Sequence, residues 1–523
     1  MSERKQTFIH GAMILLAAGL INRILGFVPR IALPRMIGAE GVGLIQLVYP
    51  FMIVLLTVIV GGLPLAVAKL VAEADTQGDA SGVRRIVRSA MTLALSASLI
   101  ASVACVGLAE WIATDVMTDP RVHSAFLIMI PVLPLAAVAS IWRGYFQGKM
   151  NMLPSAYSST TETLVRIVLS LGLAAMLIPY GLEAAAGGAV LGMVIGELAG
   201  LLVLWRLVSR ERQMNPDSKE ATAADRHTIP AGSSIYRSLL GIAIPVTGSR
   251  LIGSLSYLLE SILIARSLAA AGLTAAAATA QYGALQGMVI PVLLLPGVLT
   301  HSLAVSLVPS LSDAAARGDW RTIHKRLNQS MRLAVVTGAP FIVLMGLLAE
   351  PLCQLLYGDH SMAGMLRWMA PIAVFLYMQA PLQAALQALD RPGTALFNTF
   401  AGAAVKLVLI VQLATQPAFG ILGAVIAIGV NMVLVTLLHW FSVARLTGFR
   451  MAPFDFLKVS AAMVMMGAGA LWLWNSRLLP QDSLNLAVSS CASILLYLLL
   501  LIAMKLIDRR DAARIPFIGK LFH

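Results

Sequence analysis

The sequence predicts an all-α polytopic membrane protein with about fourteen transmembrane helices. Hydrophobic residues make up 59% of the 523 residues and charged residues only 12%, a balance that soluble globular domains do not show. Mean hydropathy is +0.84. The apolar residues recur in blocks of about 18 to 25, the length of a helix that crosses a bilayer, separated by short polar or Pro/Gly-containing connections. The blocks centre near residues 20, 57, 96, 135, 168, 195, 250, 290, 340, 376, 405, 432, 465 and 495.

Lysine and arginine accumulate in alternate connections, and this asymmetry predicts the orientation of the chain. The basic connections are 69–88, 206–237, 317–332, 445–458 and the tail 505–520. Because cytoplasmic loops carry the excess of Lys and Arg, we expect a multi-pass protein of the cell membrane with both termini in the cytoplasm. The net charge of +13 lies in loops without a stripe of interleaved aromatic residues. It therefore indicates contact with anionic membrane lipids and not with nucleic acid.

A polar segment at 209–236 divides the chain into two lobes. A shift of about 240 residues aligns LVRIVL at 164–169 with AVKLVL at 404–409, which indicates a duplication. Six helices are an even number, so both repeats enter the membrane from the same side, related by a pseudo-two-fold axis along the membrane normal. We expect these parts: an N-lobe at 1–208, a cytoplasmic linker at 209–236, a C-lobe at 237–445, and two extra helices with a basic cytoplasmic tail at 446–523.

No motif for catalysis is present. The chain has no phosphate-binding loop, metalloprotease motif or nucleophile elbow, and its three cysteines lie within apolar blocks. We therefore expect no enzymatic activity, no metal site and no cofactor. Coupling to Na⁺ or H⁺ is left open.

The first span carries two arginines at bilayer depth, where an ionisable residue costs at least about 2.5 kcal/mol and normally faces a protein interior or a wet cavity. Gly19, Arg23, Gly26 and Arg30 are spaced by four, three and four residues, so they share one helix face. Guanidinium groups suit phosphate oxygens, which makes Arg23 and Arg30 candidates for an anion site. The alternative is that they snorkel or form a static salt bridge to Glu260.

The seventh span repeats this pattern with a second cationic face. Arg250, Gly253, Tyr257 and Glu260 again lie on one side of a helix, so Arg250 joins the predicted substrate site. Tyr257 is a further cavity candidate, and Glu260 is an alternative site for a proton or sodium ion. Arg266, near the outer end of the same helix, belongs to the rim or the cavity.

Two further basic residues lie within spans and are aligned by the duplication. Arg166 follows Glu162 by four residues, which favours an ordinary intrahelical pair over a substrate contact. Lys406, its counterpart, has no acidic residue at that spacing. Glycines at positions 188, 192, 196 and 200 form a close-packing seam along the sixth span, and we expect Glu197 beside them to bond to a neighbouring helix.

Helix interruptions fall at similar places in the two halves. Gly61, Gly62 and Pro64 interrupt the second span, and Pro291 and Pro296 interrupt the eighth. Broken helices at matching positions of two repeats indicate a hinge near a binding site.

Several long stretches together resemble the stage V sporulation protein B family. They include INRILGFVPRIALPRMIGAEGVGLIQLVYP, LPLAVAKLVAEA, RGYFQGKMNMLPSA, PVTGSRLIGSLSYLLE and ARIPFIGKL. That family is similar to the lipid II flippases within the polysaccharide-exporter branch of the multidrug/oligosaccharidyl-lipid/polysaccharide superfamily. The resemblance implies fourteen helices in two lobes, alternating access, and outward movement of a lipid-linked precursor for spore cortex peptidoglycan.

The resemblance also implies roles for particular residues. Lipid II flippases line their cavity with arginines from the first helix and the start of the second lobe, and the matching positions are Arg23 and Arg250, with Arg30 close by. The chain departs from those flippases in the second and eighth helices, where it has only Lys69 and His301 near the ends.

We therefore expect a flippase in which Arg23, Arg30 and Arg250 hold the pyrophosphate of an undecaprenyl-linked peptidoglycan precursor, with membrane lipids and cortex-synthesis enzymes as further partners. One alternative is an ion-coupled multidrug exporter of the same fold, for which Glu260 is the only good acidic candidate. Another is a non-transporting scaffold for the cortex-synthesis enzymes. A membrane glycosyltransferase or acyltransferase is a more distant alternative.

Overall fold

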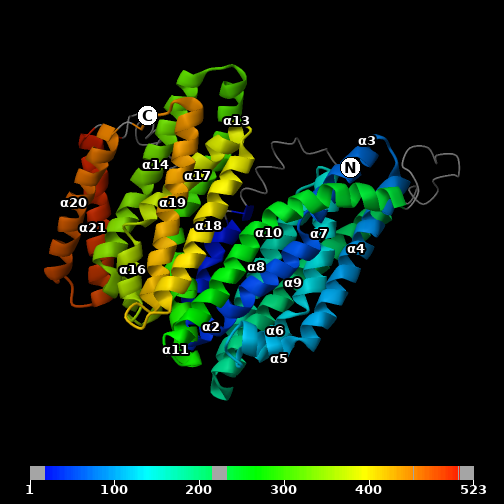
Figure 1. The fold of residues 1–523 in the computed structure, drawn as a ribbon, viewed down its shortest axis with the longest axis horizontal. Coiled ribbons are helices and arrows are strands. Elements are labelled where there is room, and N and C mark those ends of the chain that lie inside the picture. Colours follow the sequence, from blue (N-terminus) through cyan, green and yellow to red (C-terminus); the bar gives the residue numbers. More distant parts are fainter. Residues whose placement is uncertain (1–17, 20, 215–232, 452, 505, 507–523) are drawn as a thin grey trace. The chain divides into compact units, whose positions relative to one another are not determined.

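The described part of the chain consists of helices joined by short connections (Figure 1). The computed structural model describes residues 18–19, 21–214, 233–451, 453–504 and 506, and these include no β-strand. Most of the predicted cytoplasmic linker and of the basic tail lies outside the described residues. The predicted orientation of the two termini therefore stays a prediction.

Twelve helical segments among the described residues are long and apolar enough to cross a membrane, or up to 13 if the bent pair at 363–388 counts as one span. The first of these segments, Ile21–Thr76, contains 56 residues. At about 1.5 Å per residue it would extend roughly 84 Å, far more than the hydrocarbon core of one bilayer. A kink at Gly38, with φ 67° and ψ −179°, divides it. The segment thus contains the first two predicted spans, and the all-α polytopic class is confirmed.

The helices group into two compact units, Met1–Met288 and Val289–His523. The elements of the first unit, the last of which crosses the boundary, are α2 (Phe27–Val60), α3 (Leu63–Thr76), α4 (Ala80–Gly107), α5 (Ala109–Trp111), η1 (Ile112–Val116), α6 (Val122–Met129), α7 (Val132–Gly148), α8 (Leu153–Leu177), η2 (Ile178–Tyr180), α9 (Leu182–Met214), α10 (Ser233–Ala270), α11 (Ala275–Gly283) and η4 (Ala284–Val289). Helix α10 packs against α2 and α3 within this unit. A C-lobe that begins at residue 237 stays a prediction.

The glycine seam predicted along the sixth span is present between α8 and α9. A Cβ atom added at Gly192 would lie 2.2 Å from the backbone nitrogen of Ser170, and one at Gly196 would lie 2.7 Å from the Cβ of Arg166. Only glycine permits this approach, which is the usual way for membrane helices to pack closely. The seam places the polar residues of α8 directly beside α9.

The second unit contains two hydrophobic clusters that share helix α14. Its elements are α12 (Ile290–Leu294), α13 (Gly297–Ala316), α14 (Trp320–Leu347), α15 (Ala349–Tyr357), α16 (Ala363–Met369), α17 (Ala373–Ala388), α18 (Pro392–Ala414), α19 (Ile421–Thr447), α20 (Pro453–Asn475) and α21 (Asp482–Ala503). Buried tyrosines tie its helices together, because Tyr377 donates to the carbonyl of Leu293 at 2.8 Å and Tyr497 to that of Val336 at 3.0 Å. These bonds satisfy phenolic groups that would otherwise be costly to bury.

The internal repeat is visible in local backbone structure. Gly78 and Gly318, 240 residues apart, both have left-handed φ values, of 73° and 67°. Each precedes an aspartate that begins a helix: Asp79 accepts a backbone N–H bond at 2.6 Å at the start of α4, and Asp319 accepts one at 3.0 Å at the start of α14. The same turn and N-cap thus recur at the offset that the sequence alignment predicts.

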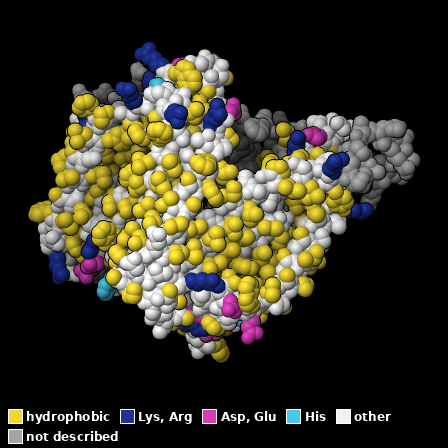
Figure 2. Space-filling model, in the orientation of Figure 1, with side chains coloured by type: hydrophobic (Ala, Val, Ile, Leu, Met, Phe, Trp, Pro, Cys, Tyr) yellow, Lys and Arg dark blue, Asp and Glu magenta, His cyan; other side chains and the backbone are white. Residues whose placement is uncertain are grey.

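Apolar side chains cover most of the helix surfaces on the face drawn in Figure 2, and the Lys and Arg side chains visible there gather toward helix ends. Large apolar side chains such as Ile100 and Val103 on α4 are 71% and 73% exposed. Apolar helix flanks with charges at the ends are typical of membrane-spanning helices.

Candidate functional site

The two predicted arginines of the first span are both exposed. Arg23 lies in a short helical segment at 21–25, and Arg30 lies in the first turns of α2, where its guanidinium is 5.7 Å from the ring centroid of Phe27. Neither arginine forms a salt bridge with an acidic residue in the part of the chain that the structure describes. Asn22, next to Arg23, donates to the Ser159 hydroxyl of α8 at 3.2 Å. This bond anchors the first helix to α8.

Arg250 binds directly to the predicted hinge. Its Nη1 donates to the backbone carbonyl of Gly61 at 2.7 Å, and the Gly62 N–H donates to the Thr247 hydroxyl at 2.9 Å. Gly61 follows the last residue of α2, and Gly62 precedes the first residue of α3. Thr247 and Arg250 are three residues apart on α10 and share one face. A predicted phosphate-binding residue and a predicted helix break are therefore in contact.

Tyr257 and Glu260 lie further along α10. Glu260 is buried and accepts a hydrogen bond from the Gln286 side chain at 2.7 Å. Helix α10 packs against α2, so the helices that carry Arg250 and Arg30 are neighbours within the first unit. Gln286 was not predicted.

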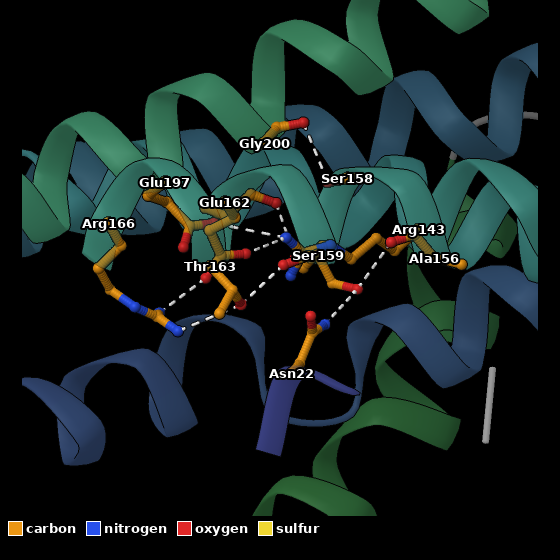
Figure 3. Close-up of polar contacts among 12 residues, drawn as sticks. Asn22, Arg143, Ala156, Ser158, Ser159, Glu162, Thr163, Arg166, Glu197 and Gly200 are labelled. Atoms are coloured by element: carbon orange, nitrogen blue, oxygen red, sulfur yellow. Dashed lines mark hydrogen bonds and ion pairs between the residues drawn. The ribbon is translucent and has the colours of Figure 1, made fainter. Parts of the chain in front are cut away.

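The four-residue spacing of Glu162 and Arg166 produces the expected intrahelical pair, at 3.0 Å, but the pair belongs to a larger cluster (Figure 3). Arg143 of α7 donates to the other Glu162 oxygen at 2.8 Å. The same guanidinium nitrogen lies 3.9 Å from Glu197 of α9. Glu197 therefore contacts a neighbouring helix, as expected, and Arg143 joins three helices.

The cluster is unevenly satisfied. Both arginines bind Glu162, whereas one buried oxygen of Glu197 accepts no hydrogen bond from the described residues. Arg166 also donates to the Thr163 hydroxyl at 3.4 Å. That hydroxyl in turn donates to the carbonyl of Ser159, the residue whose side chain accepts from Asn22. The sequence analysis did not predict a role for Arg143. Its position within an apolar span was nevertheless a signal, because a charged residue there requires a partner.

A second unpredicted polar cluster lies in the connection before α6. Arg121 donates to Asp119 at 2.7 Å and to Glu40 at 2.5 Å, and Thr279 of α11 donates to Asp119 at 2.7 Å. Asp119 is fully buried. Burial raises the pKa of its carboxyl, but the hydrogen bonds from Arg121 and Thr279 outweigh burial, and the pKa lies below its ordinary value.

The other predicted residues have simpler surroundings. Arg266 is exposed and donates to the Asp115 carbonyl at 2.5 Å. Pro64 lies in the first turn of α3. In the second unit, Lys406 is buried on α18, while Pro291 lies in the first turn of α12 and Pro296 immediately precedes α13. The predicted interruption of the eighth span is thus present.

Comparison with known proteins gives consistent matches. A family model described as polysaccharide biosynthesis protein matches residues 8–315, and one described as MatE matches residues 245–411. Stage V sporulation protein B of Bacillus subtilis (strain 168) is 39% identical over 522 residues, covering 99% of both chains. Lipid II flippase MurJ of the same organism is 25% identical over 430 residues, covering 77% of both.

A solved structure has the same fold. Lipid II flippase MurJ in an inward closed conformation matches with a TM-score of 0.70 and 15% identity, covering 95% of this chain and all of that chain. Two of these matches, one in sequence and one in structure, are lipid II flippases by name, and the MatE match agrees with the predicted fold.

Proposed function

We propose, from the premise that this chain belongs to the polysaccharide biosynthesis protein family, that it is a flippase for an undecaprenyl-pyrophosphate-linked peptidoglycan precursor. The coarser part of this statement, a multi-pass membrane transporter of the flippase superfamily, follows from the family. The names of two relatives, stage V sporulation protein B and lipid II flippase, support the finer part, which is a lipid II-like substrate used in spore cortex synthesis.

The observation that carries the proposal is the set of exposed arginines in apolar spans. Arg23, Arg30 and Arg250 are exposed, and none of them forms a salt bridge with an acidic residue that the structure describes. A charge at bilayer depth that lacks a protein counter-ion is costly, so its retention indicates an anionic ligand or a wet cavity. Each guanidinium presents a planar fork of donors that matches phosphate oxygens.

The broken helices supply the moving parts of the proposed mechanism. The α2–α3 break at Gly61 and the break around Pro291 and Pro296 lie in corresponding spans of the two repeats, as expected for hinges in alternating access. No covalent step is required. Cortex-synthesis enzymes would use the precursor on the outer side.

A binding experiment tests the substrate class. Purified protein in nanodiscs is titrated with undecaprenyl pyrophosphate and with undecaprenol, and wild type is compared with Arg23→Ala/Arg30→Ala/Arg250→Ala. We expect wild type to prefer the pyrophosphate and the triple variant to lose that preference while it still binds the prenyl chain. The matched control replaces Arg84 and Arg206, which are exposed on α4 and α9, by alanine. Equal affinity of wild type for the two lipids would contradict the proposal.

A further inference from the structure

Helix α10 caps both sides of the break between α2 and α3 with side chains from a single face. The Thr247 hydroxyl accepts from the N–H of Gly62, and Arg250 donates to the carbonyl of Gly61. Helix ends leave backbone N–H and C=O groups without intrahelical partners. The two side chains therefore satisfy one backbone donor and one backbone acceptor at the break.

The backbone at the break lies too close to α10 for any side chain. A Cβ atom at Gly61 would lie 2.4 Å from the Thr247 hydroxyl oxygen, and one at Gly62 would lie 2.3 Å from the carbonyl oxygen of Ala243. Because the approach is this tight, a change in the bend between α2 and α3 must displace the Gly61 carbonyl relative to α10. The hydrogen bond transmits that displacement to Arg250.

The geometry leaves Arg250 able to bind a second acceptor. Only its Nη1 is engaged by the Gly61 carbonyl, and the side chain is exposed. The guanidinium has five N–H donors in a rigid plane, so the Nε and Nη2 edge stays available for a bidentate phosphate. The carbonyl on one edge fixes the direction in which the other edge points.

We propose that Thr247 is a positioning residue, which holds the α2–α3 break so that the Gly61 carbonyl orients Arg250 toward a phosphate of the substrate. This inference rests on the proposed function. Binding and bending are then coupled, and the coupling is reciprocal: the substrate stabilises the break in this geometry, and the intact break strengthens binding.

Hydrogen exchange and binding measured on the same samples test the proposal. Full-length protein in nanodiscs is compared with Thr247→Val, which removes the acceptor at nearly constant volume, and with Thr247→Ser, which keeps it. We expect Thr247→Val to speed exchange of the Gly62 amide about two- to tenfold, the range for one net hydrogen bond, and to weaken undecaprenyl pyrophosphate binding by a similar factor. Thr247→Ser should keep both at the wild-type level.

A third variant separates positioning from general structure. Arg250→Lys keeps the charge but has no planar fork, so adding Thr247→Val to it should weaken binding less than twofold. Faster exchange of the Gly62 amide in Thr247→Val with unchanged pyrophosphate binding would overturn the coupling. Unchanged exchange of that amide would show that Thr247 does not hold the break. Failure of the wild type to bind undecaprenyl pyrophosphate would instead count against the proposed function, and the coupling would fall with it. Exchange of the Gly62 amide would still decide whether Thr247 holds the break.

Discussion

Replacement of Arg143 by methionine is expected to destabilise the first unit by about 3 kcal/mol, because it leaves a mostly buried carboxylate without its partner. Removal of one member of a buried ion pair costs about 3 to 5 kcal/mol. The lower end applies here, since the Arg143 side chain is 28% exposed while Glu162 and Glu197 are 13% and 15% exposed. Arg166 still neutralises Glu162 in the variant, so the surplus charge falls on Glu197. The expected loss is about a hundredfold in the unfolding equilibrium.

The measurement is the free energy of unfolding in detergent micelles, obtained by titration with SDS and tryptophan fluorescence. The matched control is Arg84→Met on α4, an exposed arginine, for which we expect a change within about 0.5 kcal/mol. A double variant, Arg143→Met/Glu197→Gln, removes the surplus charge and should recover at least about 1 kcal/mol. Equal stability of Arg143→Met and Arg84→Met, or no recovery in the double variant, would refute the reasoning.

Three further predictions concern packing, pH and capping. Gly192→Ala should lower the free energy of unfolding by about 1 to 3 kcal/mol in the same titration, because its Cβ would lie 2.2 Å from the backbone of α8. Gly172→Ala, where a Cβ would meet open space, should not lower it. Equal effects of the two substitutions would contradict the close packing of α8 and α9. The pKa of Asp119 is lowered mainly by Arg121 despite burial, so its contribution to stability is present above its ordinary pKa and is lost as pH falls below about 4. Between pH 6 and pH 3, thermal midpoints should fall more in wild type than in Asp119→Asn, and equal falls would contradict the role of Asp119. Asp79→Ala removes the N-cap of α4 and should lower stability by about 1 kcal/mol in thermal melts, and an unchanged melt would show that the cap is dispensable.

Features that depend on periodicity were predictable from the sequence. The lengths of the apolar blocks predicted the helices, and the four-residue spacing of the glycines predicted the close packing of α8 and α9. The pair of Glu162 and Arg166 followed from the geometry of one helix, because residues four apart lie side by side.

Contacts between segments distant in sequence were not predictable. Arg143 meets Glu162 across 19 residues, and Arg250 meets Gly61 across 189. No local spacing encodes such contacts, because they depend on how complete helices pack. A charged residue in an apolar span signals that a partner is required, but it does not identify that partner. Thr247 carried no signal at all, since a threonine in a membrane helix usually bonds to its own backbone.

The measurement that tests the central claim most directly is translocation of undecaprenyl-pyrophosphate muropeptide in proteoliposomes, scored as substrate exposed on the far leaflet. Wild type is compared with Arg23→Ala/Arg250→Ala and with the control Arg84→Ala/Arg206→Ala, each reconstituted in equal amount and checked for folding. We predict movement by the wild type and the control, and loss of movement in Arg23→Ala/Arg250→Ala. Undiminished movement by the folded Arg23→Ala/Arg250→Ala protein, or no movement by the wild type under sodium, proton or voltage gradients, would contradict the account.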